Sequence, residues 1–350
     1  MHDFSCPLPS ADFNHSRIQA GHGSGGKMTA DLIRNIFQKY LISDGLAQGN
    51  DAAVLPIPDS TGRIAVTTDS HIVAPLFFPG GDIGRLAVCG TVNDLLTSGA
   101  VPVALTAGFI LEEGFRISEL ERILKSMQMS AVEANVQIVA GDTKVVEKGR
   151  GDGLFITTAG FGWIRDDFQP QGDLAKPGDA VLVTGTVGDH GMAVLCARGE
   201  LGFQSDIQSD TAPLNAIVEK LRQTAPSTHV LRDPTRGGLG TTLNEIAVQS
   251  AVSIEIDEQL VLVSPQVRSL CDLLGFDPLY VANEGKMIVI LPEADAEAAL
   301  SAIRSCKYGE NAAIIGRVTS AARPGVLLKT ALGTTRILDS LHGEMLPRIC

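Results

Sequence analysis

The clearest pattern in the chain is a helical repeat of apolar residues between Ser118 and Ala134. The apolar positions recur three or four residues apart, which places their side chains on one face of a helix; they are Leu120, Ile123, Leu124, Met127 and Ala131. Ser118 and Glu121 form an S-x-x-E capping box at its start. We therefore predict an amphipathic helix over this stretch.

Shorter patterns predict strands and helices that alternate in both halves of the chain. The predicted strands are Arg63–Thr68, which closes at Asp69, Val136–Ala140, Leu154–Trp163, Ala180–Thr184, Met287–Leu291 and a hairpin of Val326–Thr330 with Thr334–Leu338. The predicted helices are Asp82–Ser98 with Asp82 as N-cap, one from about Gly191, Thr241–Val248 and Ala294–Ser305. Such alternation favours an α/β or α+β fold.

The length of 350 residues indicates about two domains. A boundary is expected in Gln169–Gly178, which holds two prolines and two glycines. We divide the chain into a flexible glycine-rich segment, an N-terminal domain, a C-terminal domain and a mobile, exposed tail; the ranges are 1–40, 41–168, 169–338 and 339–350.

Composition narrows the class of protein. Hydrophobic residues make up 44% and charged residues 19%, so a packed core is expected. The net charge of −12 argues against a nucleic-acid partner, which requires a basic face. No apolar run is long enough for a membrane helix and no secretory signal is visible. The six cysteines form no CxxC pair, so we expect free thiols and a cytoplasmic protein.

Two glycine motifs overlap at Gly21–Lys27. The segment satisfies both GxGxxG and GxxxxGK, but it lacks a preceding strand, and Met28 replaces the hydroxyl residue of a P-loop. We interpret it as a loop whose Gly23, Gly25 and Gly26 leave room for phosphate and which carries Lys27. A plain flexible loop is the alternative, and a glycine turn at Gly185–Gly191 has the same two readings.

Four aspartates lie at element ends or among small residues, at Asp51, Asp69, Asp94 and Asp142. Carboxylates suit Mg²⁺, which bridges nucleotide phosphates. Each aspartate alone is more typical of a turn or a helix cap. Lys144 could neutralise phosphate or act as a base, and Glu284 could be a general base, although each could equally be a solvated side chain. Arg236 could clamp phosphate or pair with a surface acid.

The sequence ends in Leu346-Pro347-Arg348-Ile349-Cys350. A thiol at the end of a tail can be modified by another protein and swung into a pocket. An incidental free thiol is the alternative, and the histidines show no metal-ligand spacing.

Several motifs together resemble the hydrogenase maturation factors of the HypE family, in the aminoimidazole ribonucleotide synthetase (PurM-like) superfamily. They are HGSGGK (His22–Lys27), NDAAVL (Asn50–Leu55), the stretch Thr67–Leu95, FILEEG (Phe109–Gly114), IVAGDTKVV (Ile138–Val146), DPTRGGL (Asp233–Leu239), NEGK (Asn283–Lys286) and PRIC (Pro347–Cys350). They follow one another over nearly the whole chain.

The resemblance implies a PurM-like two-domain architecture, in which the N-terminal sheet-and-helix domain forms a homodimer and is followed by a C-terminal α/β domain. It implies that a carbamoyltransferase, HypF, loads a carbamoyl group onto Cys350. The enzyme then uses ATP to dehydrate this S-carboxamide to an S-cyanate, and the cyano group passes to iron on a HypC–HypD complex for a [NiFe]-hydrogenase.

The resemblance also assigns roles to residues. It implies nucleotide binding by Gly23, Gly25, Gly26, Lys27, Asp51, Asp69, Asn93, Asp94, Asp142 and Thr143, with the four aspartates holding Mg²⁺. Cys350, Lys144 and Glu284 become the catalytic residues. Two alternatives are another ATP-using member of the superfamily, such as a selenophosphate synthetase or thiamine-phosphate kinase, and a carrier that only presents a modified thiol.

Overall fold

The computed structural model describes residues 17–19, 22, 27–42, 63–165, 167–199, 202, 205–320, 323–341, 346 and 349. The N-terminal half contains β1 (Arg63–His71), β2 (Phe77–Phe78), β3 (Gly81–Asp82), β4 (Ala100–Glu112), β5 (Gln137–Val146) and β6 (Leu154–Ile164). Its helical segments are α1 (Lys27–Leu32), η2 (Ile33–Phe37), α2 (Gln38–Tyr40), α4 (Ile83–Thr97) and α5 (Ile117–Glu133).

The C-terminal half begins after the expected boundary. Its strands are β7 (Asp179–Val183), β8 (Val230–Arg232), β9 (Ser253–Asp257), β10 (Ile288–Pro292), β11 (Ala313–Thr319), β12 (Gly325–Lys329) and β13 (Thr335–Leu338). Its helical segments are α6 (Asp189–Ala197), α7 (Asn215–Thr224), α8 (Gly238–Gln249), α9 (Pro265–Leu274), η3 (Pro278–Tyr280), η4 (Glu293–Asp295) and α10 (Ala296–Arg304).

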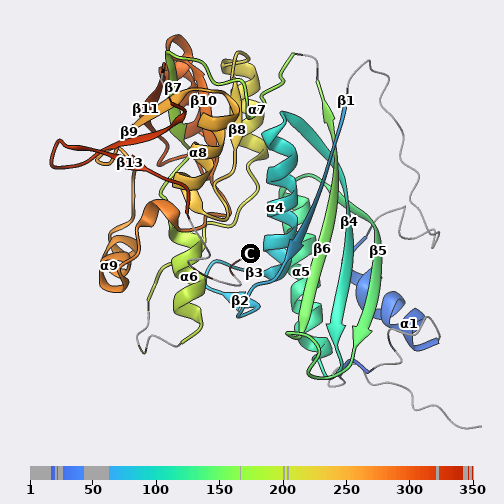
Figure 1. Cartoon of the computed structure of the whole chain (residues 1–350). Helices are drawn as coiled ribbons and strands as arrows, with labels where there is room; N and C mark the ends of the chain where they lie inside the picture. Colours follow the sequence, from blue (N-terminus) through green and yellow to red (C-terminus); the bar gives the residue numbers. More distant parts are fainter. Residues whose placement is uncertain are drawn as a thin grey trace, which may run out of the picture.

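The N-terminal sheet has the strand order β1-β6-β4-β5, and α4 and α5 cover one of its faces (Figure 1). The opposite face carries large hydrophobic side chains that are exposed to solvent, at Ile64, Val66, Val101, Val103, Ile110 and Phe161. We call this the open face. A surface of this kind is typical of a site that another protein surface covers.

The C-terminal sheet has the strand order β13-β12-β9-β11-β7-β10-β8. Alternating residues of its interior strand β7 enter two different cores: Leu182 belongs to the core that continues into the N-terminal half, and Val183 belongs to the core that includes Leu243 of α8. Both faces of the sheet are therefore buried, and the two halves share one continuous apolar core.

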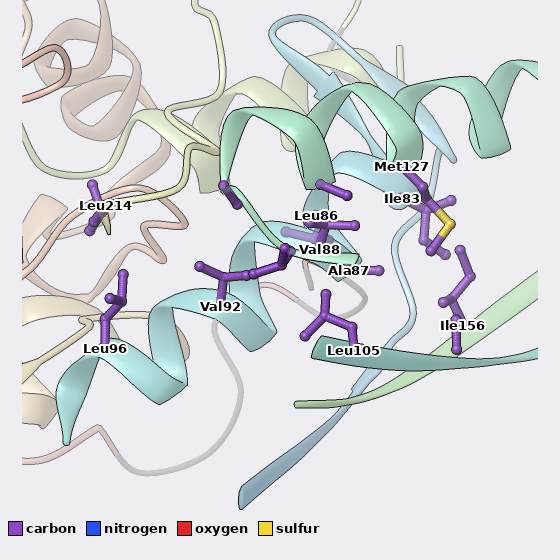
Figure 2. Packing of buried hydrophobic residues seen from close by; sticks show 14 of the residues in the cluster. Ile83, Leu86, Ala87, Val88, Val92, Leu96, Leu105, Met127, Ile156 and Leu214 are labelled. Carbon is purple, nitrogen blue, oxygen red and sulfur yellow. The ribbon is translucent and has the colours of Figure 1, made fainter. Parts of the chain in front are cut away.

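Helix α4 connects the two halves. Twelve of its fifteen residues are buried, because it packs on the sheet, on α5 and on the C-terminal half. Figure 2 shows Leu86 and Val88 within the N-terminal core, and Leu96 near Leu214 of the C-terminal half. Polar side chains on the last turns of α4 are therefore held at the junction between the halves.

Several predicted elements are confirmed. They include α4 with Asp82 as its N-cap, β6, and the hairpin of β12 and β13, which pair antiparallel. The predicted capping box is wrong, because α5 begins at Ile117 and Arg116 precedes it without a side-chain cap. Strand β5 does not end before Asp142 but runs on to Val146, because it pairs in parallel with β4 along that length. None of the helices in the described ranges is long and apolar enough to cross a membrane.

The cap of α4 gives a first prediction. Asp82 Oδ1 accepts hydrogen bonds from the backbone N–H groups of Gly84 and Arg85 at 2.7 and 3.1 Å. We expect Asp82→Ala to lower the free energy of unfolding by about 1 kcal/mol, measured by urea denaturation.

Asp82→Asn is the matched control. It keeps an acceptor oxygen for the two N–H groups but carries no charge, so it separates the hydrogen bonds of the cap from the charge of the carboxylate. Equal stability of the alanine and asparagine variants would contradict this role.

Candidate active site

Acidic side chains from both halves converge at the junction. Asp69 comes from β1, Asp94 from the last turn of α4, Asp233 from the loop after β8, and Glu284 from the loop before β10. Thr67 Oγ1 donates a hydrogen bond to Asp94 Oδ2 at 3.0 Å. We call Asp69, Asp94, Asp233 and Glu284 the acidic cluster.

A glycine on α4 allows this approach. A Cβ atom at Gly90 would lie 3.2 Å from Cε1 of His71, 3.3 Å from Oδ2 of Asp69 and 3.9 Å from Oε2 of Glu284. An added side chain would therefore be closer than usual to the side chains of His71 and Asp69, which would have to shift by a few tenths of an ångström. Gly90 brings carboxylates of two elements to one wall of the junction.

The cluster holds more negative charge than its surroundings balance. Burial, then Asp233 and Asp69, raise the pKa of Asp94 to about 7. Burial, with Asp69 contributing, raises the pKa of Asp233 to about 6. Burial first, and then the other acids, raise the pKa of Glu284 well above its usual value. Like charges in a buried site require either protons or a cation.

A magnesium ion that arrives with a nucleotide fits these residues. Within the described part of the chain, no three His, Cys, Asp or Glu side chains are placed to hold a metal ion by themselves. Mg²⁺ is usually held by one or two carboxylates together with phosphates and waters. Glu284 Oε1 is buried without a hydrogen-bond partner, so the cluster has acceptor capacity to spare for a ligand.

A cavity of about 590 Å³ opens beside the cluster, between α4 and the segment that follows β8. Asp94 and Asp233 line it together with Arg232 and Arg236. This volume is in the range of small-molecule sites, and arginines are the side chains that best match phosphate groups. The lining therefore combines groups for a metal ion with groups for phosphate.

Backbone contacts hold Glu284 in place from both halves. Its N–H donates to Asp210 Oδ1 at 3.1 Å, and its carbonyl accepts from Asn93 Nδ2 at 3.3 Å. The Asn93 side chain also donates through Nδ2 to the carbonyl oxygen of Ala212, and its Oδ1 accepts a hydrogen bond from the N–H of Leu214. Asn93 is thus engaged by backbone groups of the C-terminal half, and its role in nucleotide binding stays a prediction.

Asp142, Thr143 and Lys144 lie elsewhere. The register runs from Asp69 through Thr158 and Ala107 to Gly141, which precedes Asp142, so three strand spacings of about 4.8 Å separate the two aspartates. Within one chain Asp142 therefore lies apart from Asp69 and Asp94, and its place in the metal site stays a prediction.

The residues around Asp142 face different sides of the sheet. Asp142 and Lys144 form an ion pair of 2.9 Å and are largely exposed, at 72% and 65% of their side chains. They alternate with the buried Thr143 and share a face with Ile110, which pairs with Lys144 in the register. One chain therefore does not bring Lys144 to Glu284, because they lie on opposite sides of the sheet.

The end of the chain reaches the junction. Ile349 is 4% exposed and belongs to the shared core. Its carbonyl oxygen lies 2.8 Å from Nε2 of His190. The expectation of an exposed tail is wrong at this residue, because an apolar side chain near the end finds a buried site.

The remaining predicted site residues lie outside the described part of the chain. They are Gly23, Gly25, Gly26, Asp51, Cys350 and the side chain of Lys27. Three residues of the junction were not predicted as site residues. They are Asp210, His190 and Asp233. The motif DPTRGGL contains Asp233, but only its arginine drew attention; His190 lies in the glycine turn Gly185–Gly191 but was read as ordinary, and no pattern marked Asp210.

Comparisons with known proteins place the chain in a family. The AIR synthase related protein models match residues 49–164 (N-terminal domain) and 176–329 (C-terminal domain). Carbamoyl dehydratase HypE of Cupriavidus necator is 51% identical over 95% of this chain and 95% of its own length. HypE of Azotobacter vinelandii is 49% identical over 97% and 99%. The chain belongs to the HypE family of carbamoyl dehydratases.

Solved HypE structures share the whole fold. A crystal structure of HypE in complex with ATP has a TM-score of 0.90 at 52% identity and covers 95% of this chain and 99% of that one. The HypE chain of a HypE–HypF complex has a TM-score of 0.77 at 49% identity, covering 89% and 99%. Thiamine-monophosphate kinase of Stenotrophomonas maltophilia, at 22% identity and a TM-score of 0.63, shares the fold alone.

The acidic cluster gives a prediction for pH and stability. Folded Asp94 keeps its proton up to about pH 7, whereas an unfolded aspartic acid loses it near pH 4. Rising pH therefore favours the unfolded state, and the metal-free protein loses stability between these values. We expect Asp94→Asn, which has no charge to bury, to be more stable than the parent chain at pH 8 by about 1–3 kcal/mol.

The measurement is thermal unfolding of both proteins at pH 4.5 and pH 8 in the presence of a metal chelator. The stability that Asp94→Asn gains at pH 8 should be nearly absent at pH 4.5. Asp257→Asn is the control: Lys329 lowers the pKa of Asp257, so its replacement should bring no gain at pH 8. An Asp94→Asn variant with the same pH profile as the parent chain would contradict the buried charge.

Proposed function

We propose that this chain uses ATP to dehydrate a carbamoyl group carried on the sulfur of its own Cys350. The oxygen of the S-carboxamide attacks the γ-phosphorus, and ADP leaves. One N–H proton is lost to form a C=N bond, and the second is lost as phosphate departs, which leaves an S-cyanate. Phosphorylation is needed because an amide oxygen is otherwise a very poor leaving group.

The observation that carries this proposal is the position of Ile349. Its carbonyl binds His190, whose ring also contacts Ser209, and the next residue, Asp210, binds the backbone of Glu284. The residue before Cys350 is therefore linked by three short contacts to a buried carboxylate with a raised pKa. A substrate tethered in this way reacts as an intramolecular partner.

Glu284 has the properties of a proton acceptor in this reaction. Its raised pKa makes it a stronger base than an exposed glutamate, and Oε1 has no competing hydrogen bond. Asp210 and Asn93 hold its backbone, so the carboxylate keeps its position as a proton arrives. We assign it one of the two N–H protons.

The nucleotide would occupy the cavity beside the acidic cluster. One or two of Asp69, Asp94 and Asp233 would hold Mg²⁺ together with phosphate oxygens, and its charge would stabilise the phosphoryl group. The glycine loop with Gly23, Gly25, Gly26 and Lys27, and also Asp51, would complete the phosphate site. The HypE structure with ATP supports the nucleotide assignment for this family.

A second copy of the chain would supply the residues that one chain leaves distant. The open face has the apolar character of a subunit interface, and Asp142 and Lys144 lie on that face. Pairing two open faces would let Lys144 approach the site of a neighbouring subunit, where it could take the other proton or neutralise phosphate.

Two protein partners follow from the same proposal. A HypE–HypF complex supports HypF as the carbamoyl donor. A HypC–HypD complex is proposed as the acceptor of the cyano group on iron.

Mass spectrometry of the intact chain tests the reaction. With HypF, carbamoyl phosphate and ATP, the chain should gain one carbamoyl group and then lose one water. Cys350→Ala should abolish both changes, whereas Cys306→Ala, at a partly exposed cysteine, should keep both. A chain that gains the group and never loses water would be a carrier, and a change that maps to Cys6 would overturn the assignment.

Asp94→Asn separates the two steps. The tail should still accept the carbamoyl group, but dehydration should slow by about tenfold or more, because a ligand of the metal–phosphate site is weakened. Equal loss of both steps would mean that Asp94 supports the fold or the HypF surface instead.

Charge on the open face tests the dimer. We expect Val66→Glu and Phe161→Glu to convert a dimer to a monomer in analytical ultracentrifugation, because an interface core does not tolerate an unpaired carboxylate. Leu332→Glu, at a hydrophobic residue that is 92% exposed in the C-terminal half, should leave the mass unchanged. A dimer that survives both sheet variants would show that another surface pairs the subunits.

A further inference from the structure

His190 has a defined hydrogen-bonding state at the domain junction. Its ring is fully buried on α6, with Nδ1 2.8 Å from Ser209 Oγ and Nε2 2.8 Å from the carbonyl oxygen of Ile349. A carbonyl oxygen only accepts hydrogen bonds, so Nε2 carries the proton. Nδ1 of the neutral ring then accepts a hydrogen bond from the Ser209 hydroxyl, and burial lowers the pKa of His190, which favours this neutral form.

Both halves of the protein build the place where the chain end docks. Phe78 of β2 meets the His190 ring edge-on, with 5.4 Å between the ring centroids. The backbone N–H of Ser209 donates to the carbonyl of Pro79 at 2.8 Å. The histidine and its serine partner are thus held by the N-terminal half, although both belong to the C-terminal half.

The side chains near the chain end fit the same place. Ile349 is buried in the shared core, and Leu346 packs against it. Gly191, the residue after His190, leaves room there: an added Cβ would lie 3.4 Å from Leu346 Cδ1 and 2.5 Å from Val281 Cγ1. Apolar contacts favour docking in general, while the bond from His190 to Ile349 fixes its direction and register.

We propose that His190 is a positioning residue for the dehydration, because it holds the Ile349 carbonyl and so fixes the point from which Cys350 extends. The contribution to catalysis rests on the proposed function, whereas the docking itself does not. A buried histidine that only fills the core would also satisfy its hydrogen bonds. The two roles differ in what happens to the tail when the Nε2 donor is lost.

Two amide variants separate these roles. In His190→Gln the side-chain amide nitrogen can reach the position of Nε2 and keep the bond to Ile349. In His190→Asn the shorter side chain reaches only the position of Nδ1, so the bond is lost. Both are polar and smaller than histidine, so a purely structural cost should affect them alike.

The readout is the rate at which iodoacetamide alkylates Cys350 in the full-length chain without ATP, measured by mass spectrometry of the digest. His190→Asn should raise this rate by about two- to tenfold, the factor that one hydrogen bond of ordinary net strength gives. His190→Gln should stay within about twofold of the parent chain. The buried Cys89 and Cys271 should remain protected in all three proteins.

Equal alkylation of Cys350 in both variants and the parent chain would overturn the proposal, and so would a rise of the same size in both variants. If Cys89 and Cys271 also become reactive in His190→Asn, that variant has disturbed the fold, and Ser209→Ala is used in its place. Ser209→Ala removes only the hydroxyl that holds Nδ1 of His190. It should then raise Cys350 alkylation alone, and failure to do so overturns the proposal.

A second readout connects docking to the reaction. In single turnovers of the carbamoylated chain, His190→Asn should slow dehydration by the same factor as it raises alkylation, at an unchanged half-saturating concentration of ATP. His190→Gln should restore the rate. A different result is possible, in which Cys350 is protected in the parent chain and exposed in His190→Asn, but neither protein dehydrates its carbamoyl group. In that case the proposed function fails and the docking role of His190 stands.

Discussion

The central constraint on this structure is the repulsion among carboxylates buried at one junction. Asp69 and Asp94 come from the N-terminal half, and Asp233 and Glu284 come from the C-terminal half, so closing the two halves forces like charges together. The raised pKa values of Asp94 and Asp233 express the cost of this closure. A bound cation offsets that cost, so closure and nucleotide binding are energetically linked through the same groups.

The apolar core provides the stability that such a junction requires. Helix α4 is buried on nearly all sides, and its residues Val92 and Leu96 join a core that continues to Leu214 (Figure 2). The same helix presents Gly90 and Asp94 to the acidic cluster. Burial of apolar surface along α4 therefore fixes the spacing of the carboxylates, and a charged site is maintained without an ion pair at every acid.

Sequence patterns predicted elements with a clear local repeat better than elements that form through long-range pairing. The repeat in Ser118–Ala134 and the alternation in Leu154–Trp163 located α5 and β6 within one residue, because local periodicity reports a one-sided burial. Strand β4 was not predicted: its thirteen residues contain a proline and a glycine and acquire strand geometry from pairing with β5 and β6. Such pairing is a long-range interaction, and no local window contains it.

The site shows the same division. Asp69, Asp94 and Glu284 were predicted and do converge, whereas Asp142, which was grouped with them by its place at the end of a predicted strand, lies elsewhere together with Lys144. Sequence spacing cannot indicate on which edge or face of a sheet a strand end lies, because that depends on strand order. His190 lies in the glycine turn Gly185–Gly191, but its contact with Ile349, 159 residues away, is visible only in the structure, as is the bond between Asp210 and Glu284.

The docked tail must also be releasable, and this limits how strongly it can bind. A substrate on its own chain reaches the site at a high effective concentration, so a few weak contacts are enough to hold it there. A carbamoyl donor, however, must reach the same sulfur from outside the chain. One neutral hydrogen bond from His190 and a single buried isoleucine suit both demands, because each has a modest net free energy. An ion pair buried at this position would hold the tail more firmly and would slow its loading.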